Sequence, residues 1–117
     1  MSGPAADCLF CKMACGEIPI DPLVENTHVF AIRDINPRAP VHVLIIPRRH
    51  IPDANALRPA DAPLLGEVFT AAATVAGMEG VAADGYRLAF NVGEAAGMTI
   101  PHLHLHLVGG RRLAAEG

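Results

Sequence analysis

The sequence predicts a single α+β domain. Its 117 residues are enough for one hydrophobic core but not for two, and hydrophobic residues make up 51% of them. Five short segments have the character of β-strands, and one longer segment carries an apolar stripe at helical spacing. The expected strands are 23–25, 28–33, 41–46, 86–92 and 101–108, and the expected helix follows Asp61 and ends at Met78 to Gly80.

The two ends of the chain are expected to add little to this domain, which is taken to span 1–117. Residues 1–7 are expected to be flexible, and 113–117 form a short tail. Lys12–Gly16 is expected to be a short helical segment that ends at its glycine.

The first three strands frame a loop of functional interest. The first two are expected to form a hairpin, and loop 34–40, which follows, is dense in turn-forming residues. Such loops, fixed between strands, often carry ligand-binding groups. The third strand is expected to be central and to stop at Pro47, with His42 as a buried, hydrogen-bonded core histidine rather than a catalyst.

The main helix is expected to pack on the sheet and to carry no catalytic group. Asp61 is a plausible N-cap, and Pro63 suits the first turn. Its apolar stripe consists of Leu64, Leu65, Val68, Phe69, Ala72, Val75 and Ala76.

Histidine and leucine alternate near the C-terminus, which is the period-two pattern of a strand with two different faces. His102, His104 and His106 would share one face, and the leucines between them would point into the core. Imidazole gains little from packing on a sheet, whereas at pH 7 it can act as a nucleophile, a hydrogen-bond donor or a metal ligand. Three histidines in register therefore indicate a functional site.

All three cysteines lie near the N-terminus, and Cys8 and Cys11 form a Cys-x2-Cys pair. An odd, clustered set argues against a disulfide framework. A closed zinc site needs four ligands, and the chain has no second Cys-x2-Cys pair. If the pair binds zinc, the other two ligands must be histidines.

Charge and hydropathy exclude several classes of protein. The formal charge is −3 without a long run of Lys or Arg, so extended nucleic-acid binding has little electrostatic support. No apolar run reaches the roughly 18 residues of a membrane span, and the first seven residues do not resemble a secretory signal. We therefore expect a cytoplasmic protein that binds neither membrane nor nucleic acid.

The segment from His102 to Val108 matches His-φ-His-φ-His-φ-φ, with φ apolar, at every position, and the chain thereby resembles the histidine triad (HIT) family. Its Hint-like purine nucleoside phosphoramidase branch is the most similar. The resemblance covers roughly residues 8 to 112. The other matching segments, in family order, are Glu17-Ile18-Pro19, the loop Asp34–Pro40, Ile46–Ile51, Asn91-Val92-Gly93 and Gly109-Gly110-Arg111.

The resemblance implies an antiparallel sheet of about five strands with one main helix, and a sheet continued across a homodimer. It also implies a catalytic set, with His104 as nucleophile, His106 as a donor to phosphate oxygens, and Thr99 near the phosphate and leaving group; His102 completes the triad. The residues it implies for nucleotide binding, besides Thr99, His104 and His106, are Leu9, Phe10, Met13, Ile18 and Ile32 at the base, Asp34 and Ile35 at the ribose, and Asn91. The implied zinc ligands are Cys8, Cys11, His50 and His102, and no organic cofactor is implied.

The expected function is hydrolysis of purine nucleoside 5′-phosphoramidates through a nucleotidyl-histidine intermediate. Within the family, a dinucleoside polyphosphate hydrolase is the alternative. From the residues alone, two other classes stay open: a metallohydrolase with the three histidines around a catalytic ion, and a nucleotide-binding module without turnover. A straight strand does not readily bring a histidine at i+4 to a shared ion, which counts against the metallohydrolase.

Overall fold

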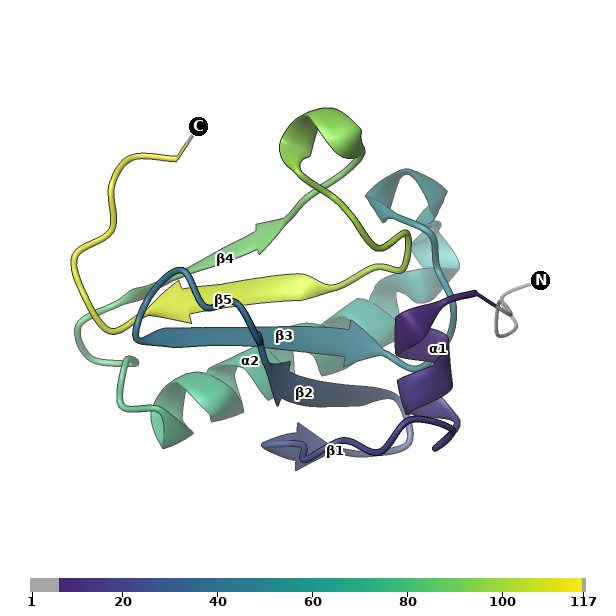
Figure 1. Cartoon of the computed structure of the whole chain (residues 1–117), viewed down its shortest axis with the longest axis horizontal. Coiled ribbons are helices and arrows are strands. Elements are labelled where there is room, and N and C mark those ends of the chain that lie inside the picture. The colour runs from purple at the N-terminus through teal and green to yellow at the C-terminus, as the bar shows by residue number, and fades with distance from the viewer. Residues whose placement is uncertain (1–6, 117) are drawn as a thin grey trace.

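A five-stranded antiparallel sheet forms the centre of the protein (Figure 1), as expected. The structure is a computed structural model that describes residues 7–116, so most of the start expected to be flexible lies outside the described residues. The strand order is β1-β2-β3-β5-β4, which places the last strand in sequence between β3 and β4. The strands are β1 (Val24–Glu25), β2 (Val29–Arg33), β3 (Val41–Pro47), β4 (Tyr86–Phe90) and β5 (Leu105–Gly109).

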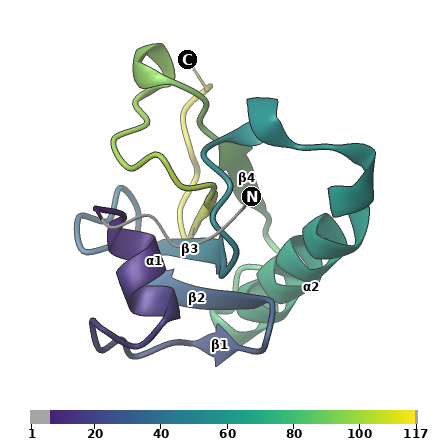
Figure 2. The same ribbon diagram turned by 90° about the vertical axis from the view of Figure 1, so that its right-hand side faces the viewer.

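Two α-helices cover opposite faces of the sheet, as Figure 2 shows. The short α1 (Leu9–Ala14) lies over one face near the end of β3, and α2 (Ala62–Met78) packs along the other face, against β2, β3 and β5. Three single-turn 3₁₀ helices complete the fold: η1 (Ala54–Ala56), η2 (Pro59–Asp61) and η3 (Glu94–Ala96).

Side-chain alternation along β3 divides the interior into two layers. Val43 and Ile45 point into the core under α2, whereas Leu44 and Ile46 belong to a second cluster with Phe10 of α1. Successive side chains of a strand point to opposite faces, so one buried strand serves both layers. The same alternation decides which side chains of β3 and β5 reach the face under α1.

The main helix was predicted correctly as an element, with two differences in detail. Phe69 is 44% exposed and meets Phe90 edge-on instead of lying under the helix. It flanks the stripe that Val68 and Ala72 form, because neighbouring residues are about 100° apart around a helix. Asp61 precedes the helix as predicted, but its carboxylate makes no cap hydrogen bond, because it binds Arg49 and the backbone N–H of Arg58.

The histidine strand begins later than expected, at Leu105 rather than Pro101. The backbone N–H of His102 donates to Ile100 O at 2.8 Å in a turn, and that of Leu103 donates to Ile51 O at 2.7 Å. These bonds hold the first two triad histidines outside the strand ladder. The expected orientation of the leucines is nonetheless confirmed, since Leu103, Leu105 and Leu107 are all buried.

Other boundaries shift by a few residues. The first helix is Leu9–Ala14 rather than Lys12–Gly16, and β4 ends at Phe90 rather than Val92. His42 is buried and hydrogen-bonded, as predicted. Within residues 7–116, no helix has the length and apolar character that crossing a membrane requires.

Candidate active site

A cavity of about 320 Å³ lies at the junction of α1, the loop after β2 and the segment leading into β5. It combines apolar side chains with two triad histidines, one carboxylate and two arginines, which is the mixture expected of a small-molecule site. The lining residues are Leu9, Phe10, Met13, Ile32, Arg33, Asp34, Ile35, Asn36, Arg38, Leu44, Gly97, Thr99, Ile100, His104 and His106.

His104 is held with one ring nitrogen bonded to the backbone. Its Nδ1 lies 2.7 Å from the carbonyl oxygen of His102, which can only accept, so Nδ1 carries the proton. The other nitrogen, Nε2, then has a free lone pair. The ring lies edge-on to Phe10 at a centroid distance of 5.1 Å, which fixes its plane. His104 is therefore a neutral imidazole prepared to act as a nucleophile.

His106 receives its orientation from His42 on the neighbouring strand. Leu44 is paired with His106 across β3 and β5, so His42 is the diagonal neighbour of His106 on the same face. The backbone N–H of Arg38 donates to His42 Nδ1 at 3.1 Å, which leaves the proton of a neutral His42 on Nε2. His42 Nε2 then donates to His106 Nδ1 at 3.0 Å, and His106 must carry its own proton on Nε2.

Burial keeps these rings neutral. Loss of hydration lowers the pKa of His104 and of His42 below the ordinary value of 6.5, and it lowers the pKa of His106 to about 4. The charge of Asp34 acts in the opposite direction on all three, but it is the smaller effect. At pH 7 the cavity therefore presents a lone pair on His104 and an N–H on His106.

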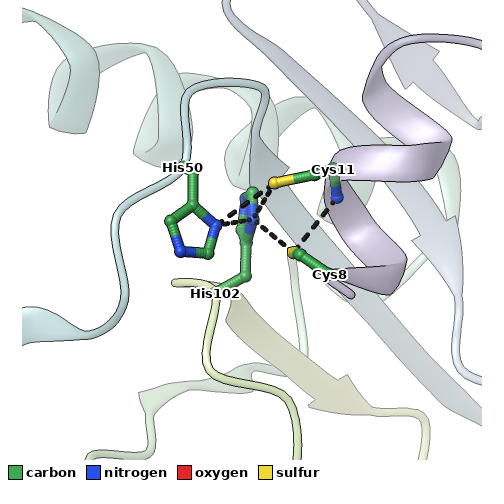
Figure 3. A group of neighbouring side chains, drawn as sticks. All are labelled: Cys8, Cys11, His50 and His102. Carbon is green, nitrogen blue, oxygen red and sulfur yellow. Dashed lines mark hydrogen bonds between the residues drawn. The ribbon is translucent and has the colours of Figure 1, made fainter. Parts of the chain in front are cut away.

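His102 lies in a separate cluster with Cys8, Cys11 and His50, which Figure 3 shows with α1 on the right. Cys8 is the N-cap of α1 and Cys11 lies in its first turn, the loop after β3 supplies His50, and the segment before β5 supplies His102. The four ligand atoms all lie within 4.8 Å of one another. The triad histidines thus separate into two sites, since His104 and His106 line the cavity.

The dimensions of this cluster fit a tetrahedral metal ion. His102 Nδ1 lies 3.2 Å from Cys8 Sγ and 3.4 Å from Cys11 Sγ, and His50 Nδ1 lies 3.2 Å from Cys11 Sγ. With Zn–S bonds of about 2.3 Å and Zn–N bonds of about 2.0–2.1 Å, unlike ligands of a tetrahedral zinc are about 3.5 Å apart. His102 Nε2 donates to Pro47 O at 2.7 Å, which leaves Nδ1 unprotonated as a metal ligand must be.

A second group of potential ligands, Asp34, His42 and His106, is explained by hydrogen bonds. Both nitrogens of His42 and the Nδ1 of His106 are engaged as described, and Asp34 Oδ2 lies 3.5 Å from His42 Nε2. Within residues 7–116, neither candidate metal cluster contains His104. The geometry therefore gives no support to a catalytic ion shared by the three triad histidines.

Comparisons with known proteins show the family of the chain. The model of the HIT domain matches residues 15–113. The chain belongs to the HIT family. It is 43% identical over 109 residues to the purine nucleoside phosphoramidase of Escherichia coli (strain K12), which covers 93% of this chain and 92% of the relative. Cys8 and Cys11 precede the matched segment.

Solved structures of HIT family hydrolases have the same fold. The one from Legionella pneumophila Philadelphia 1 superposes with a TM-score of 0.89 at 45% identity, covering 92% of this chain and 96% of the other. The one from Clostridium thermocellum has a TM-score of 0.91, also at 45% identity, and covers 96% and 97% of the two chains. The predicted family and fold class are thereby confirmed.

Most of the residues that the HIT resemblance nominated for the nucleotide lie together. The cavity is lined by Leu9, Phe10, Met13, Ile32, Asp34, Ile35, Thr99, His104 and His106. Ile18 and Asn91 are not among the described residues that line it. Ile18 follows the end of α1, and Asn91 follows the end of β4.

Sequence reasoning missed two contributions to the site. The sequence predicts His42 as a core residue, but it also orients His106. Only the strand register shows this, because it pairs Leu44 with His106 and so places His42 diagonally beside that ring. Arg38 was part of the nominated loop without a role, yet it lines the cavity. Its position on the same loop as Asp34, four residues before His42, was the available signal.

Proposed function

We propose that this HIT-family protein is a nucleotide hydrolase that cleaves purine nucleoside 5′-phosphoramidates through a nucleotidyl-histidine intermediate. The observation that carries the proposal is the bond from His104 Nδ1 to the His102 carbonyl, which leaves Nε2 as a nucleophile in the cavity. The relatives named as a purine nucleoside phosphoramidase and as HIT family hydrolases support the same class of reaction.

The reaction proceeds in two displacements at phosphorus. His104 Nε2 attacks the α-phosphorus, the P–N bond breaks, and the amine leaves with a proton taken up from solvent. Water then attacks the phosphorus and gives a proton back to solvent, the bond to His104 breaks, and a nucleoside monophosphate is released. The N–H of His106 and the hydroxyl of Thr99 donate to the phosphoryl oxygens and the leaving group. Each displacement avoids the slow direct attack of water on the phosphoramidate.

The composition of the cavity suits a purine nucleotide. Its apolar side chains Leu9, Phe10, Met13 and Ile32 can enclose a flat base, and Asp34 can accept hydrogen bonds from ribose hydroxyls. No side chain among these four offers a hydrogen bond that would distinguish adenine from guanine. We expect weak discrimination between the two bases.

The leaving group is an amine rather than a polyphosphate because the loop that carries Thr99 lacks cations. The loop from Glu94 to Thr99 contains one acid and no Lys or Arg. Arg48 and Arg49 bind Glu25 and Asp61, and Arg111 binds backbone carbonyls. A polyphosphate would bring several further negative charges and would need such partners.

Relative turnover of two substrates tests this proposal. We expect a higher kcat/KM for an adenosine 5′-phosphoramidate than for diadenosine tri- or tetraphosphate, and a higher value for the polyphosphate would show the assignment to be wrong. The same assay with a strong chelator separates the other classes. Activity of the metal-free protein excludes a catalytic ion, and nucleotide binding without turnover of any of these substrates indicates a binding module.

Zinc is the metal we propose for Cys8, Cys11, His50 and His102. Two thiolates and two imidazoles form a closed set typical of structural zinc, which supplies a cross-link and no chemistry at phosphorus. The cross-link would tie α1 to the loop after β3, which holds His50, and to the segment before β5, which holds His102. Because α1 also supplies Leu9, Phe10 and Met13 to the cavity, the metal supports the shape of the base site.

A homodimer with a continuous sheet is the proposed assembly. β4 is the end strand of the sheet, and its side chains are only half-buried. Phe69 of α2 is exposed beside Phe90 of β4, so an apolar surface adjoins the unpaired strand edge. Small-angle scattering at micromolar concentration should give the mass of a dimer, and a monomer would refute the proposal. The proposed location is the cytoplasm.

A further inference from the structure

The cavity holds one cation whose role the proposed reaction has not used. Arg38 lines it together with His104 and His106, and its side chain is exposed. Across residues 7–116, its guanidinium makes no hydrogen bond and no ion pair. The other lining arginine, Arg33, is paired with both carboxylate oxygens of Glu79.

A phosphate in this cavity would otherwise meet no unpaired positive charge. His106 accepts a hydrogen bond at Nδ1, so its ring is neutral, and the proton on His104 Nδ1 is engaged by the His102 carbonyl. Asp34 adds a negative charge to the same cavity. A nucleoside monophosphate carries nearly two negative charges at this pH, as a phosphate monoester with a second pKa of about 6 does. Neutral donors alone would leave that charge uncompensated beside a carboxylate.

The backbone of Arg38 is fixed, so its side chain starts from a defined place. Its N–H donates to His42 Nδ1 at 3.1 Å, and its carbonyl accepts from Arg111 Nη2 at 2.8 Å. Gly110 lets the end of β5 approach the same loop: it has φ +91°, and a Cβ there would lie 3.0 Å from Pro40 Cβ. The loop is thus clamped on two sides while the guanidinium stays unbonded.

The charge of Arg38 reaches the reacting end of the cavity. Burial is the main cause of the low pKa of His106, and the positive charge of Arg38 lowers that pKa further. It acts in the same direction on the pKa of His42. Arg38 and His106 also line the same cavity, so a phosphate bound there can meet both.

We propose that Arg38 is the phosphate-binding cation of this site, pairing with non-bridging oxygens of the α-phosphate while His106 and Thr99 donate to the others. The inference rests on the proposed function, since it takes the ligand to be a nucleoside 5′-phosphate. A guanidinium suits this task because it presents several N–H donors in a plane and keeps its charge at any physiological pH.

Binding of AMP and of adenosine, without turnover, tests the assignment by calorimetry. Arg38→Gln should weaken AMP binding by about 10- to 100-fold, as expected for loss of a charged hydrogen-bonded contact. Adenosine lacks the phosphate, so its affinity should not change. Arg38→Lys should restore part of the AMP affinity because it keeps the charge but not the planar fork.

Arg112→Gln is the matched control. Arg112 is exposed and lies against a different hollow, beside Asp84 and Gly85, so the substitution removes the same charge outside the cavity. It should leave both affinities unchanged. Arg38→Gln keeps both backbone hydrogen bonds, and its unfolding temperature should equal that of the wild type.

Two outcomes would overturn the inference alone: AMP affinity that survives Arg38→Gln, or AMP and adenosine affinities that fall together. The second would show that the residue shapes the loop rather than binds phosphate. A wild-type protein that binds neither ligand would overturn the proposed function and this inference with it. The AMP effect should also shrink as salt is raised, because a partly exposed ion pair is screened.

Discussion

Replacing His42 with leucine tests whether this residue sets the proton position on His106. The side chain is 3% exposed and bridges the Arg38 N–H to His106 Nδ1 by bonds of 3.1 and 3.0 Å. Leucine has a similar volume and no polar atom, so it removes both bonds while filling the space. His106 would then be free to carry its proton on Nδ1, and its Nε2 would no longer be held as a donor toward the phosphate.

The stability cost follows from the two groups left without partners. A buried donor or acceptor that loses its partner costs about 1–3 kcal/mol, and the more exposed Arg38 N–H should lie at the low end. We expect a total of about 2–4 kcal/mol, which for a domain of this size lowers Tm by about 8–16 °C. The protein should still fold, since domains are stable by about 5–15 kcal/mol.

The catalytic cost should be larger than the change in binding. Loss of one aligned donor at a transition state typically reduces kcat by about 10²–10³-fold. We therefore expect His42→Leu to lower kcat for an adenosine phosphoramidate by about 10²-fold, with AMP affinity changed far less. Steady-state kinetics and calorimetry on the folded variant measure the two effects.

His42→Gln is the control, because the amide N–H₂ of glutamine can still donate to His106 Nδ1. It should retain much more activity than His42→Leu, and nitrogen NMR shifts should show the His106 proton on Nε2 in the wild type and in this variant. If His42→Leu loses stability but keeps the wild-type kcat, or if the glutamine variant is equally slow, the tautomer argument is wrong.

The same geometry makes four further predictions. His104→Asn should leave AMP binding intact and abolish turnover. Loss of even an acid–base group reduces a rate by about 10²–10⁴-fold, so a variant that keeps more than about a hundredth of the wild-type rate would exclude His104 as the nucleophile. Elemental analysis of protein purified without chelator should find about one zinc per chain, and a zinc content near zero would refute the site. Cys11→Ser should lower Tm markedly while changing kcat little. Cys15→Ser, at an exposed cysteine outside the cluster, should change neither. Because burial lowers the pKa of His104 below 6.5, the loss of kcat/KM on acidification should have its midpoint below pH 6.5, as a pH–rate profile can show. The pKa of His106 is likewise lower in the folded protein, so the unfolded state binds more protons between pH 6.5 and about 4. The free energy of unfolding should therefore fall as the pH is lowered from 6.5 to about 4, and this group should not change it above pH 6.5, as denaturant titrations can show.

The sequence by itself determined the family, the order of the elements and most residues of the cavity. Local patterns carried this information: the alternation of His and Leu gives the buried leucines, and the apolar stripe gives α2. The resemblance carried the rest. The three histidines at fixed spacing are the motif of the HIT family, and the model of the HIT domain matches residues 15–113. Each of the two local patterns lies within one continuous segment of the chain.

Tertiary structure decided how the histidines are divided between two sites. The sequence placed His102, His104 and His106 on one strand face, but backbone hydrogen bonds to Ile51 and within the turn at Ile100 hold the first two outside the ladder. As a result His102 turns to Cys8 and Cys11, while its carbonyl fixes the ring of His104. These bonds join segments far apart in the chain, so no local pattern encodes them.

The roles of His42 and Arg38 were also decided by the fold. A histidine in an apolar strand reads as a core residue, and an arginine in a loop reads as a solvated charge. The antiparallel register of β3 and β5 sets His42 diagonally beside His106, and the clamped loop brings Arg38 to the rim of the same cavity. His42 and His106 are 64 residues apart in sequence, so only strand pairing brings them together. The role of His42 depends on that neighbour, and the role of Arg38 depends on the cavity that the fold forms beside it.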